Sequence, residues 1–321
     1  MTMVEAIKPR AMRDTLLQSV HEQMLADDKI FFTTADFGSP VLDKIREDFP
    51  KRFINVGIAE QNLINVSAGL ALEGFKVFAY AIAPFITMRC FEQIRVNLGL
   101  LSEVRPMNVN LIGVGAGYSY VVSGPTHQCY EDITLMRAMP NMRVISLADQ
   151  QISAAMPKFC LDNPGLKYLR LDAQVLPVVY GESLPDLNDG FAVNRSGKKL
   201  CLLATGYLLH TALKASEALG ERGYSVGVID LFDLSRFNEA KLLKALSGYD
   251  TVVTMEEGFV GRGGMDAMMF NFMARSNTAK RIVNMGVEGG YRFEIGERNS
   301  LHEQVGIGLN SVVSKVSQLL G

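Results

Sequence analysis

Residues 53–81 read FINVGIAEQNLINVSAGLALEGFKVFAYA and contain one complete copy of the pattern on which the fold is built. Residues 53–56 are mostly apolar and β-branched, which predicts a short strand. Residues 60–73 carry apolar side chains at helical spacing, and residues 77–81 return to the strand pattern. Because two strands joined by one helix run parallel, this stretch predicts a parallel β-α-β unit.

The same alternation extends outward from this unit over the first 180 residues. Further strands are predicted at residues 30–34, 107–113, 143–147 and 167–171, and helices at 11–26, 85–98, 131–139 and 149–161. A stretch rich in Pro, Gly and acidic residues, PVVYGESLPDLNDG at 177–190, then interrupts the pattern as a linker does. The sequence therefore predicts an α/β domain over residues 1–180, with helices on both faces of a parallel sheet, and a linker over residues 181–190.

A second, smaller α/β domain is predicted over residues 191–321. Its strands are expected at residues 200–204, 225–231, 251–256 and 281–285, and its helices at 208–222, 239–246 and 264–275. One long helix over residues 301–320 is expected to close the chain. Open α/β sheets place their binding sites at the carboxyl ends of the strands, so candidate residues are sought there.

Composition and charge exclude several functions. The 321 residues carry 32 Lys and Arg against 34 Asp and Glu, without the basic cluster that a nucleic acid or an anionic membrane requires. The weakly polar runs at 77–88 and 200–213 are too short to span a bilayer, and charges interrupt the N-terminal stretch where a signal peptide is apolar. The four cysteines lie far apart, which predicts neither disulfides nor a zinc site. We expect a cytoplasmic protein that binds neither nucleic acid nor membrane.

Two segments place an ionisable residue beside flexible backbone after a predicted strand. In NVGIAEQN at 55–62, Glu60 begins an apolar helix, where a carboxylate is partly desolvated and close to the positive helix end. In SGPTHQ at 123–128, His127 follows a Gly-Pro turn, which makes it a candidate for acid-base catalysis. From the pattern alone, a structural role explains each residue as well: Glu60 as a first-turn carboxylate and His127 as a loop residue before a helix.

These two segments belong to a longer set of motifs. The set comprises Thr34-Ala35-Asp36, VGIAEQ at 56–61, Phe85 with Arg89, Phe91 and Gln93, GPTHQ at 124–128, Arg170, and Glu256-Glu257. Over nearly the whole chain, this set resembles the C-terminal half of a transketolase, which is a pyrimidine-binding domain followed by a C-terminal domain. It is also similar to the matching part of 1-deoxyxylulose-5-phosphate synthase. The glutamate and GPTHQ segments at this separation are the specific part of the resemblance.

The resemblance implies roles at a cofactor. In that family, a glutamate at the position of Glu60 hydrogen-bonds N1′ of the aminopyrimidine of thiamine diphosphate and promotes removal of the proton from C2 of the thiazolium. His127 would hydrogen-bond the substrate oxygen and assist proton transfer while a ketose C–C bond is cleaved or formed. The other residues that the resemblance places beside the cofactor are Phe85, Met88, Phe91 and Asp36.

Four residues fall near family positions that contact the phosphate or the distal hydroxyls of the sugar. They are Arg170, Arg89, Arg13 and Ser39. A guanidinium suits phosphate because its planar fork binds two oxygens at once. For Arg89 and Arg13, an ordinary surface or interface ion pair explains the residue equally well.

The chain departs from the family pattern in its sugar pocket. Transketolases usually have a substrate histidine upstream of the GPTHQ run and an acidic residue directly before its glycine, where this chain has Gly115 and Ser123. Losing these two hydrogen-bonding groups changes which hydroxyl pattern a pocket accepts. We therefore expect a non-standard ketose or a modified sugar phosphate as substrate.

The family's diphosphate and metal motif, Gly-Asp-Gly with a later Asn, has no match in the 321 residues, and no other oxygen-ligand cluster replaces it. We therefore expect no metal ligand on this chain. A partner, the N-terminal-half (α) subunit, would hold Mg²⁺ or Ca²⁺ and the diphosphate, and thiamine diphosphate would bind across the interface of an α2β2 assembly. The chain itself would be the β subunit of a two-subunit transketolase.

Three other functions stay open at this stage. The β subunit of a 2-oxoacid dehydrogenase E1 component has a similar length and the same glutamate, but commonly His-Ser-Gln in place of GPTHQ. An enzyme similar to deoxyxylulose-phosphate synthase is favoured by Arg89 and Gln93. A structural or regulatory subunit without activity is the third, although the presence of both Glu60 and His127 argues against it.

Overall fold

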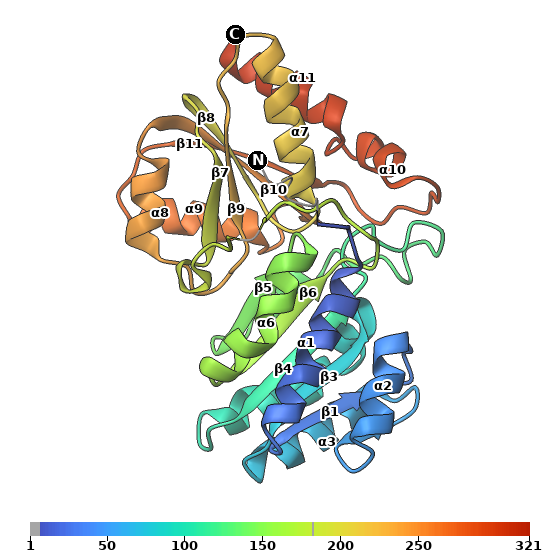
Figure 1. Cartoon of the computed structure of the whole chain (residues 1–321). Coiled ribbons are helices and arrows are strands. Elements are labelled where there is room, and N and C mark those ends of the chain that lie inside the picture. The colour runs from blue at the N-terminus through green and yellow to red at the C-terminus, as the bar shows by residue number, and fades with distance from the viewer. Residues whose placement is uncertain (1–6, 182) are drawn as a thin grey trace, which may run out of the picture.

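Two separate β-sheets organise the chain into two domains that lie one above the other in Figure 1. The structure is a computed structural model and describes residues 7–181 and 183–321. Within these residues, no helix is long and apolar enough to cross a membrane.

The first sheet is parallel throughout, with the strand order β2-β1-β3-β4-β6-β5. Its strands are β1 (Ile30–Thr34), β2 (Phe53–Asn55), β3 (Lys76–Ile82), β4 (Asn108–Val114), β5 (Met142–Ser146) and β6 (Leu166–Leu171). The strands β4, β5 and β6 are buried at every residue, as a parallel sheet covered on both faces requires. The predicted parallel α/β architecture is confirmed.

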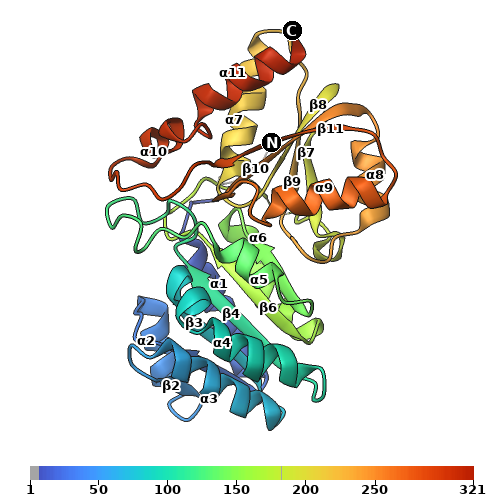
Figure 2. The same cartoon turned by 180° about the vertical axis from the view of Figure 1, so that it is seen from behind.

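Helices cover both faces of this sheet. α1 (Met12–Ala26), α2 (Pro40–Asp48) and α6 (Gln150–Asp162) lie in front of it in Figure 1, whereas α3 (Glu60–Leu72), α4 (Phe91–Gln93) and α5 (Asp132–Arg137) lie in front in Figure 2. The sequence pattern did not predict α2. Only Leu42 and Ile45 of this helix are buried, and charged residues fill most of its other positions.

The predicted helix over residues 85–98 is irregular. It consists of a π-helical turn, η1 (Phe85–Arg89), the short α4, and a second π-helical segment, η2 (Ile94–Leu100). The hydroxyl of Thr87 donates a hydrogen bond to the carbonyl of Ala83 at 2.7 Å inside the first turn. Wide turns of this kind are rare and frequently occur at functional sites.

The second sheet has the order β11-β10-β8-β9-β7. Its strands are β7 (Phe191–Arg195), β8 (Lys199–Ala204), β9 (Gly227–Leu231), β10 (Tyr249–Phe259) and β11 (Arg281–Val287). In Figure 1, α7 (Leu208–Glu221) and α11 (Leu309–Leu320) lie on one side of this sheet, and α8 (Glu239–Leu246) and α9 (Met265–Arg275) on the other. The edge strand β7 was not predicted. It pairs antiparallel to β9, and Phe191 is its one buried residue, so it lacks the apolar run of the central strands.

The prediction of one helix over residues 301–320 is wrong. The segment contains α10 (Arg298–Gln304) and α11, separated by a turn in which Gly306 has φ 78°. A side chain at Gly306 would strain this left-handed conformation. The carboxylate of Glu303 accepts hydrogen bonds from the backbone N–H groups of Asn310 and Ser311, which fixes the start of α11.

Backbone hydrogen bonds join the two domains. The N–H of Ser146 on the edge strand β5 donates to the carbonyl of Phe232 at 2.8 Å, and the N–H of Leu234 donates to the carbonyl of Val144 at 2.8 Å. The guanidinium of Arg137 reaches across to the carbonyl of Gly264 at 2.9 Å. The second domain is therefore held in a defined position against the first.

A buried ion network forms a second contact between the domains. Arg298 pairs with Glu257 at 2.7 Å and with Asp172 at 2.5 Å, and His302 contacts Glu257 at 2.6 Å. The backbone N–H of Tyr118 donates to the same carboxylate at 3.3 Å. Burial alone would raise the pKa of Glu257, but Arg298 and His302 outweigh this effect and hold that pKa well below its usual range.

Candidate active site

Glu60 is a nearly buried carboxylate at the carboxyl-end edge of the first sheet. It is the first residue of α3, follows the turn after β2, and is 5% exposed. Its two carboxylate oxygens accept hydrogen bonds from Nη1 of Arg89 at 3.1 and 3.2 Å. Among the described residues, Arg89 is the one side chain recorded in contact with this carboxylate. The N-terminus of α3 stabilises its negative charge.

Arg89, Phe85 and His127 continue the contacts that begin at Glu60. The guanidinium carbon of Arg89 lies 3.9 Å from the centroid of the Phe85 ring, in a cation–π contact. The Phe85 ring in turn meets His127, whose ring centroid lies 5.3 Å from that of Phe85 at an interplanar angle of 68°. The two predicted catalytic residues, Glu60 and His127, are thus connected through side chains of the η1 turn.

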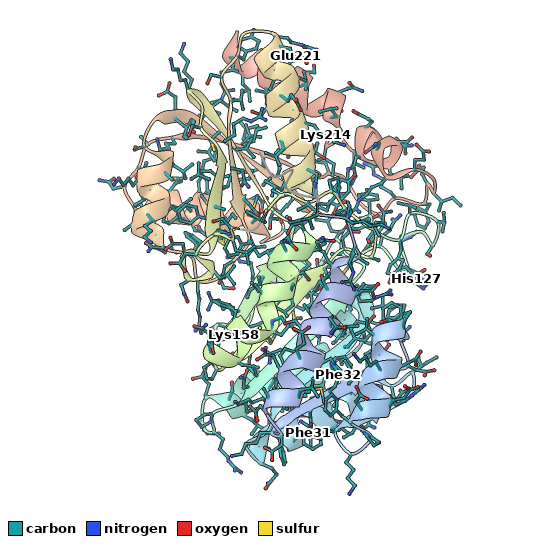
Figure 3. All side chains as sticks on the ribbon, viewed as in Figure 1. Phe31, Phe32, His127, Lys158, Lys214 and Glu221 are labelled. Atoms are coloured by element: carbon teal, nitrogen blue, oxygen red, sulfur yellow. The ribbon has the colours of Figure 1, made fainter. Side chains whose placement is uncertain are left out.

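One nitrogen of His127 is fixed by its neighbour. Nδ1 and the hydroxyl of Thr126 form a hydrogen bond of 2.9 Å, so Nε2 is the ring nitrogen that can face a substrate. The side chain is half-buried, and Figure 3 shows it at the edge of the molecule, near the height at which the two domains meet. Thr126 is a site residue that sequence reasoning did not single out, although it lies inside the GPTHQ run.

Tyr120 is a second residue that sequence reasoning missed. Gly115 has φ 95°, and a Cβ atom there would lie 1.9 Å from a ring carbon of Tyr120. The Tyr120 ring therefore fills the space beside Gly115, and its centroid lies 6.1 Å from that of His127. Burial raises the pKa of Tyr120 to about 12, although the charge of Arg13 acts in the opposite direction. In the sequence, the one indication of this arrangement was the glycine at position 115, which leaves space for a neighbouring side chain.

Asp36 lies beside the loop that carries Glu60. Its backbone has φ 52°, and its N–H donates to Oδ1 of Asn55 at 3.1 Å. Its carboxylate accepts from Nδ2 of Asn55 at 3.0 Å, and Asn55 also accepts from the N–H of Gly57 at 2.9 Å. Asp36 therefore ties the end of β1 to the turn before α3.

Met88 and Phe91 come from the same irregular helix as Phe85, but their surroundings differ. Met88 is 38% exposed. Phe91 packs against the core and lines a cavity with Leu100, Met139 and Pro140. Of the three residues of this irregular helix that are expected beside the cofactor, Phe85 is the one whose ring contacts that of His127.

Arg13 and Ser39 lie on the side of the first sheet that α1 and α2 cover. Arg13 pairs with its neighbour Asp14 at 2.8 Å, and its charge acts on the hydroxyls of both Tyr80 and Tyr120. Ser39 is buried at the start of α2, and its hydroxyl has no hydrogen-bond partner among the described residues. An unpaired buried hydroxyl is free to meet a ligand group.

Arg170 is buried where the two domains meet. Its side chain is 2% exposed, pairs with Asp132 at 2.7 Å and donates to the carbonyl of Glu257 at 2.9 Å. These contacts join the first domain to the second, and the contact of Arg170 with a sugar phosphate stays a prediction.

The residues present fit one end of a thiamine cofactor. A flat, nitrogen-bearing group already stacks on Phe85 and donates hydrogen bonds to Glu60, namely the guanidinium of Arg89. An aminopyrimidine offers the same two features, a flat face and nitrogen-bound hydrogens. The metal end has no counterpart in residues 7–181 and 183–321, because no group of three or more His, Cys, Asp or Glu side chains there could hold an ion.

Comparison with known proteins agrees with this geometry. Residues 8–177 match the family described as "Transketolase, pyrimidine binding domain", and residues 190–312 match "Transketolase, C-terminal domain". The fold and the site thus define a protein of the thiamine-diphosphate enzyme class. The chain belongs to the transketolase family and corresponds to its C-terminal two domains.

Several relatives are separate subunits of a transketolase. The B subunit of apulose-4-phosphate transketolase from Actinobacillus succinogenes is 29% identical over 268 residues, which are 83% of this chain and 84% of that protein. The 6-deoxy-6-sulfo-D-fructose transketolase subunit SqwH of Clostridium sp. is 29% identical over 309 residues, 94% of this chain and 92% of that protein.

A solved structure described as "Split gene transketolase, inactive beta4 tetramer" has the same fold. It matches with a TM-score of 0.84 at 28% identity and covers 97% of this chain and 98% of that one. The chain is therefore homologous to the B subunits of split transketolases.

Proposed function

We propose that this chain is the C-terminal (β) subunit of a two-subunit, thiamine-diphosphate-dependent transketolase. The enzyme would transfer a two-carbon ketol unit between a ketose phosphate and an aldose. The observation that carries this proposal is the connected set Glu60, Arg89, Phe85 and His127. In this set the guanidinium of Arg89 joins a nearly buried carboxylate to the aromatic ring that a half-buried imidazole contacts.

Glu60 and His127 would hold protons at two different places. Bound thiamine diphosphate would supply the carbon that carries the two-carbon unit. The carboxylate of Glu60 would share a proton with a ring nitrogen of the aminopyrimidine, while Phe85 excludes water from one face of that ring. Nε2 of His127 would hydrogen-bond the substrate oxygen and pass a proton to or from it, since Nδ1 is held by Thr126.

A separate α subunit would complete the site. Three observations support this partner: the missing Gly-Asp-Gly motif, the names of the two relatives as transketolase subunits, and the description of a similar tetramer of β subunits as inactive. The partner would hold Mg²⁺ or Ca²⁺ and the diphosphate of the cofactor, in an α2β2 assembly. The chain alone is expected to bind thiamine diphosphate far more weakly than the complex.

Calorimetric titration tests this proposal. Thiamine diphosphate with Mg²⁺ is added to the chain alone, to the chain mixed with the product of an adjacent Gly-Asp-Gly-bearing gene, and to the same mixture with Glu60→Ala. We expect tight binding and transketolase activity in the wild-type mixture, and retained assembly without activity for Glu60→Ala. Micromolar binding by the chain alone would contradict the shared site, and full activity of Glu60→Ala would favour a non-catalytic role for the chain.

The sugar is proposed to be non-standard. Gly115 and Ser123 stand where transketolases usually have polar substrate contacts, and the Tyr120 ring fills the space beside Gly115. The two named relatives act, according to their names, on apulose 4-phosphate and on 6-deoxy-6-sulfo-D-fructose. Steady-state rates with xylulose 5-phosphate and with a panel of branched and modified ketose phosphates test this. The proposal fails if xylulose 5-phosphate is the best donor, and release of CO₂ from pyruvate would instead indicate a synthase-like reaction.

A further inference from the structure

Arg89 is the exposed member of a pair whose other member is nearly buried. Its side chain is 47% exposed, whereas that of Glu60 is 5% exposed. Nη1 of its guanidinium donates hydrogen bonds to both carboxylate oxygens of Glu60, and the guanidinium carbon lies over the ring of Phe85. An exposed arginine can carry its charge into water, and the nearly buried carboxylate that it leaves then requires another hydrogen-bond donor in its place.

The two contacts of Arg89 are the two contacts that an aminopyrimidine needs from this chain. A protonated ring nitrogen requires an oxygen of Glu60, and the ring requires the face of Phe85. Because Arg89 already occupies both carboxylate oxygens of Glu60 and the face of Phe85, the guanidinium and the pyrimidine cannot make these contacts at the same time.

We propose that Arg89 is a positioning residue that competes with the aminopyrimidine of thiamine diphosphate for Glu60 and Phe85, so that cofactor binding exchanges one flat, nitrogen-bearing group for another. Arg89 holds the carboxylate in place, and it leaves when the pyrimidine arrives. This inference rests on the proposed function, because it takes the cofactor of that function as the ligand. It also replaces the predicted contact of Arg89 with sugar phosphate.

Two substitutions of Arg89, one control and one double variant test the exchange. Arg89→Met keeps an unbranched apolar chain but removes the charge and the flat fork. Arg89→Lys keeps the charge without the flat fork and should compete less than arginine. Arg95→Met is the matched control, since Arg95 lies on the neighbouring π-helical segment, is 50% exposed and pairs with Glu92 at 3.1 Å. Glu60→Gln combined with Arg89→Met tests whether the gain depends on Glu60.

The experiment uses the full chain alone and titrates 4-amino-5-hydroxymethyl-2-methylpyrimidine, the pyrimidine half of the cofactor, while ligand-detected NMR measures its dissociation constant. We expect Arg89→Met to bind the probe about three- to thirtyfold more tightly than wild type, the range set by the loss of an exposed ion pair and a cation–π contact. The dissociation constant of Arg89→Lys should lie between those of wild type and Arg89→Met, and that of Arg95→Met should equal that of wild type.

The outcomes distinguish this inference from the proposed function. If wild type and Arg89→Met bind the probe equally, or if the gain survives Glu60→Gln, the exchange is wrong while the pyrimidine site stands. The titrations are repeated in the mixture with the α subunit. If neither wild type nor Arg89→Met binds the probe at millimolar concentrations in either form, both the exchange and the proposed pyrimidine site are wrong. Tighter binding by Arg89→Met that disappears with Glu60→Gln supports both.

Discussion

At the scale of single residues, the hydroxyl of Thr126 decides which nitrogen of His127 meets a substrate. The hydrogen bond of 2.9 Å to Nδ1 fixes the ring, and a single hydrogen bond of this kind contributes about 1 kcal/mol. We predict that Thr126→Val lowers kcat about fivefold with little change in KM, because the ring loses orientation only when it must transfer a proton. Thr126→Ser keeps a hydroxyl and should retain most of the activity.

The loss of kcat in Thr126→Val is compared with the loss in His127→Ala. Removal of a general acid-base residue lowers the rate roughly 10²–10⁴-fold, so we predict that His127→Ala lowers kcat of the reconstituted enzyme by a factor in this range. The melting temperatures of both variants should stay close to that of wild type, since residues 126 and 127 lie in a loop outside the core. A Thr126→Val enzyme with unchanged kcat would show that the hydroxyl does not orient the ring.

At the scale of elements, Glu256 at the end of β10 holds the start of α9. Its carboxylate accepts the N–H of Met265 at 3.0 Å and that of Asp266 at 2.9 Å. Burial raises the pKa of Glu256 to about 7, although these two N–H groups act to lower it. The folded protein therefore retains this proton between pH 4.5 and 7, where the unfolded chain has lost it.

The raised pKa of Glu256 sets the direction in which the stability of the protein changes with pH. Stability falls as pH rises from about 4.5 to about 7, by an amount on the order of 2–3 kcal/mol from this group, and is constant above that range. The glutamine of Glu256→Gln cannot ionise, so the variant does not lose this stability. We predict that its unfolding free energy rises relative to that of wild type as pH rises. Urea unfolding at pH 5, 6 and 8 measures the two unfolding free energies. A difference that is independent of pH would show that Glu256 ionises in the fold as it does in water.

Elements with strong periodicity could be predicted from the sequence, and those that depend on neighbours could not. β1 at Ile30–Thr34 and α8 at Glu239–Leu246 have the predicted bounds, because apolar residues recur there at strand or helix spacing. The edge strand β7 has no such run, and it forms because β9 offers it an antiparallel partner. The break at Gly306 depends on a positive φ that a pattern of apolar residues does not reveal.

The same division holds for the candidate site. Glu60 and His127 could be singled out because each lies next to permissive backbone after a strand. The contact of Arg89 with Glu60 could not, since it depends on the π-helical turn that sets the direction of the Phe85 and Arg89 side chains. The ion pair of Arg170 with Asp132 and its contact with Glu257 could not be predicted either, because the sequence does not show that the second domain covers Arg170.

At the scale of the whole molecule, the network around Arg298 stabilises the contact between the domains. This guanidinium is buried and pairs with two carboxylates, Glu257 and Asp172. Arg298→Met leaves Asp172 buried without its cation and leaves His302 as the remaining side-chain partner of Glu257. Removing one partner of a buried pair costs about 3–5 kcal/mol. We predict a loss of this size in the unfolding free energy, together with two calorimetric transitions in place of one, because the domains lose part of their contact.

The network also predicts how stability responds to acid. Because the pKa of Glu257 is held well below its ordinary value of 4.5, its contribution is fully present above about pH 4.5 and is lost as pH falls below it. Arg298→Met should therefore lose less stability between pH 5 and pH 3 than wild type does. Lys241→Met is the control, since Lys241 pairs with Asp189 at 2.7 Å on the surface and its removal should cost less than about 1 kcal/mol. If Arg298→Met unfolds in one transition and with the same acid response as Lys241→Met, the network does not hold the domains together.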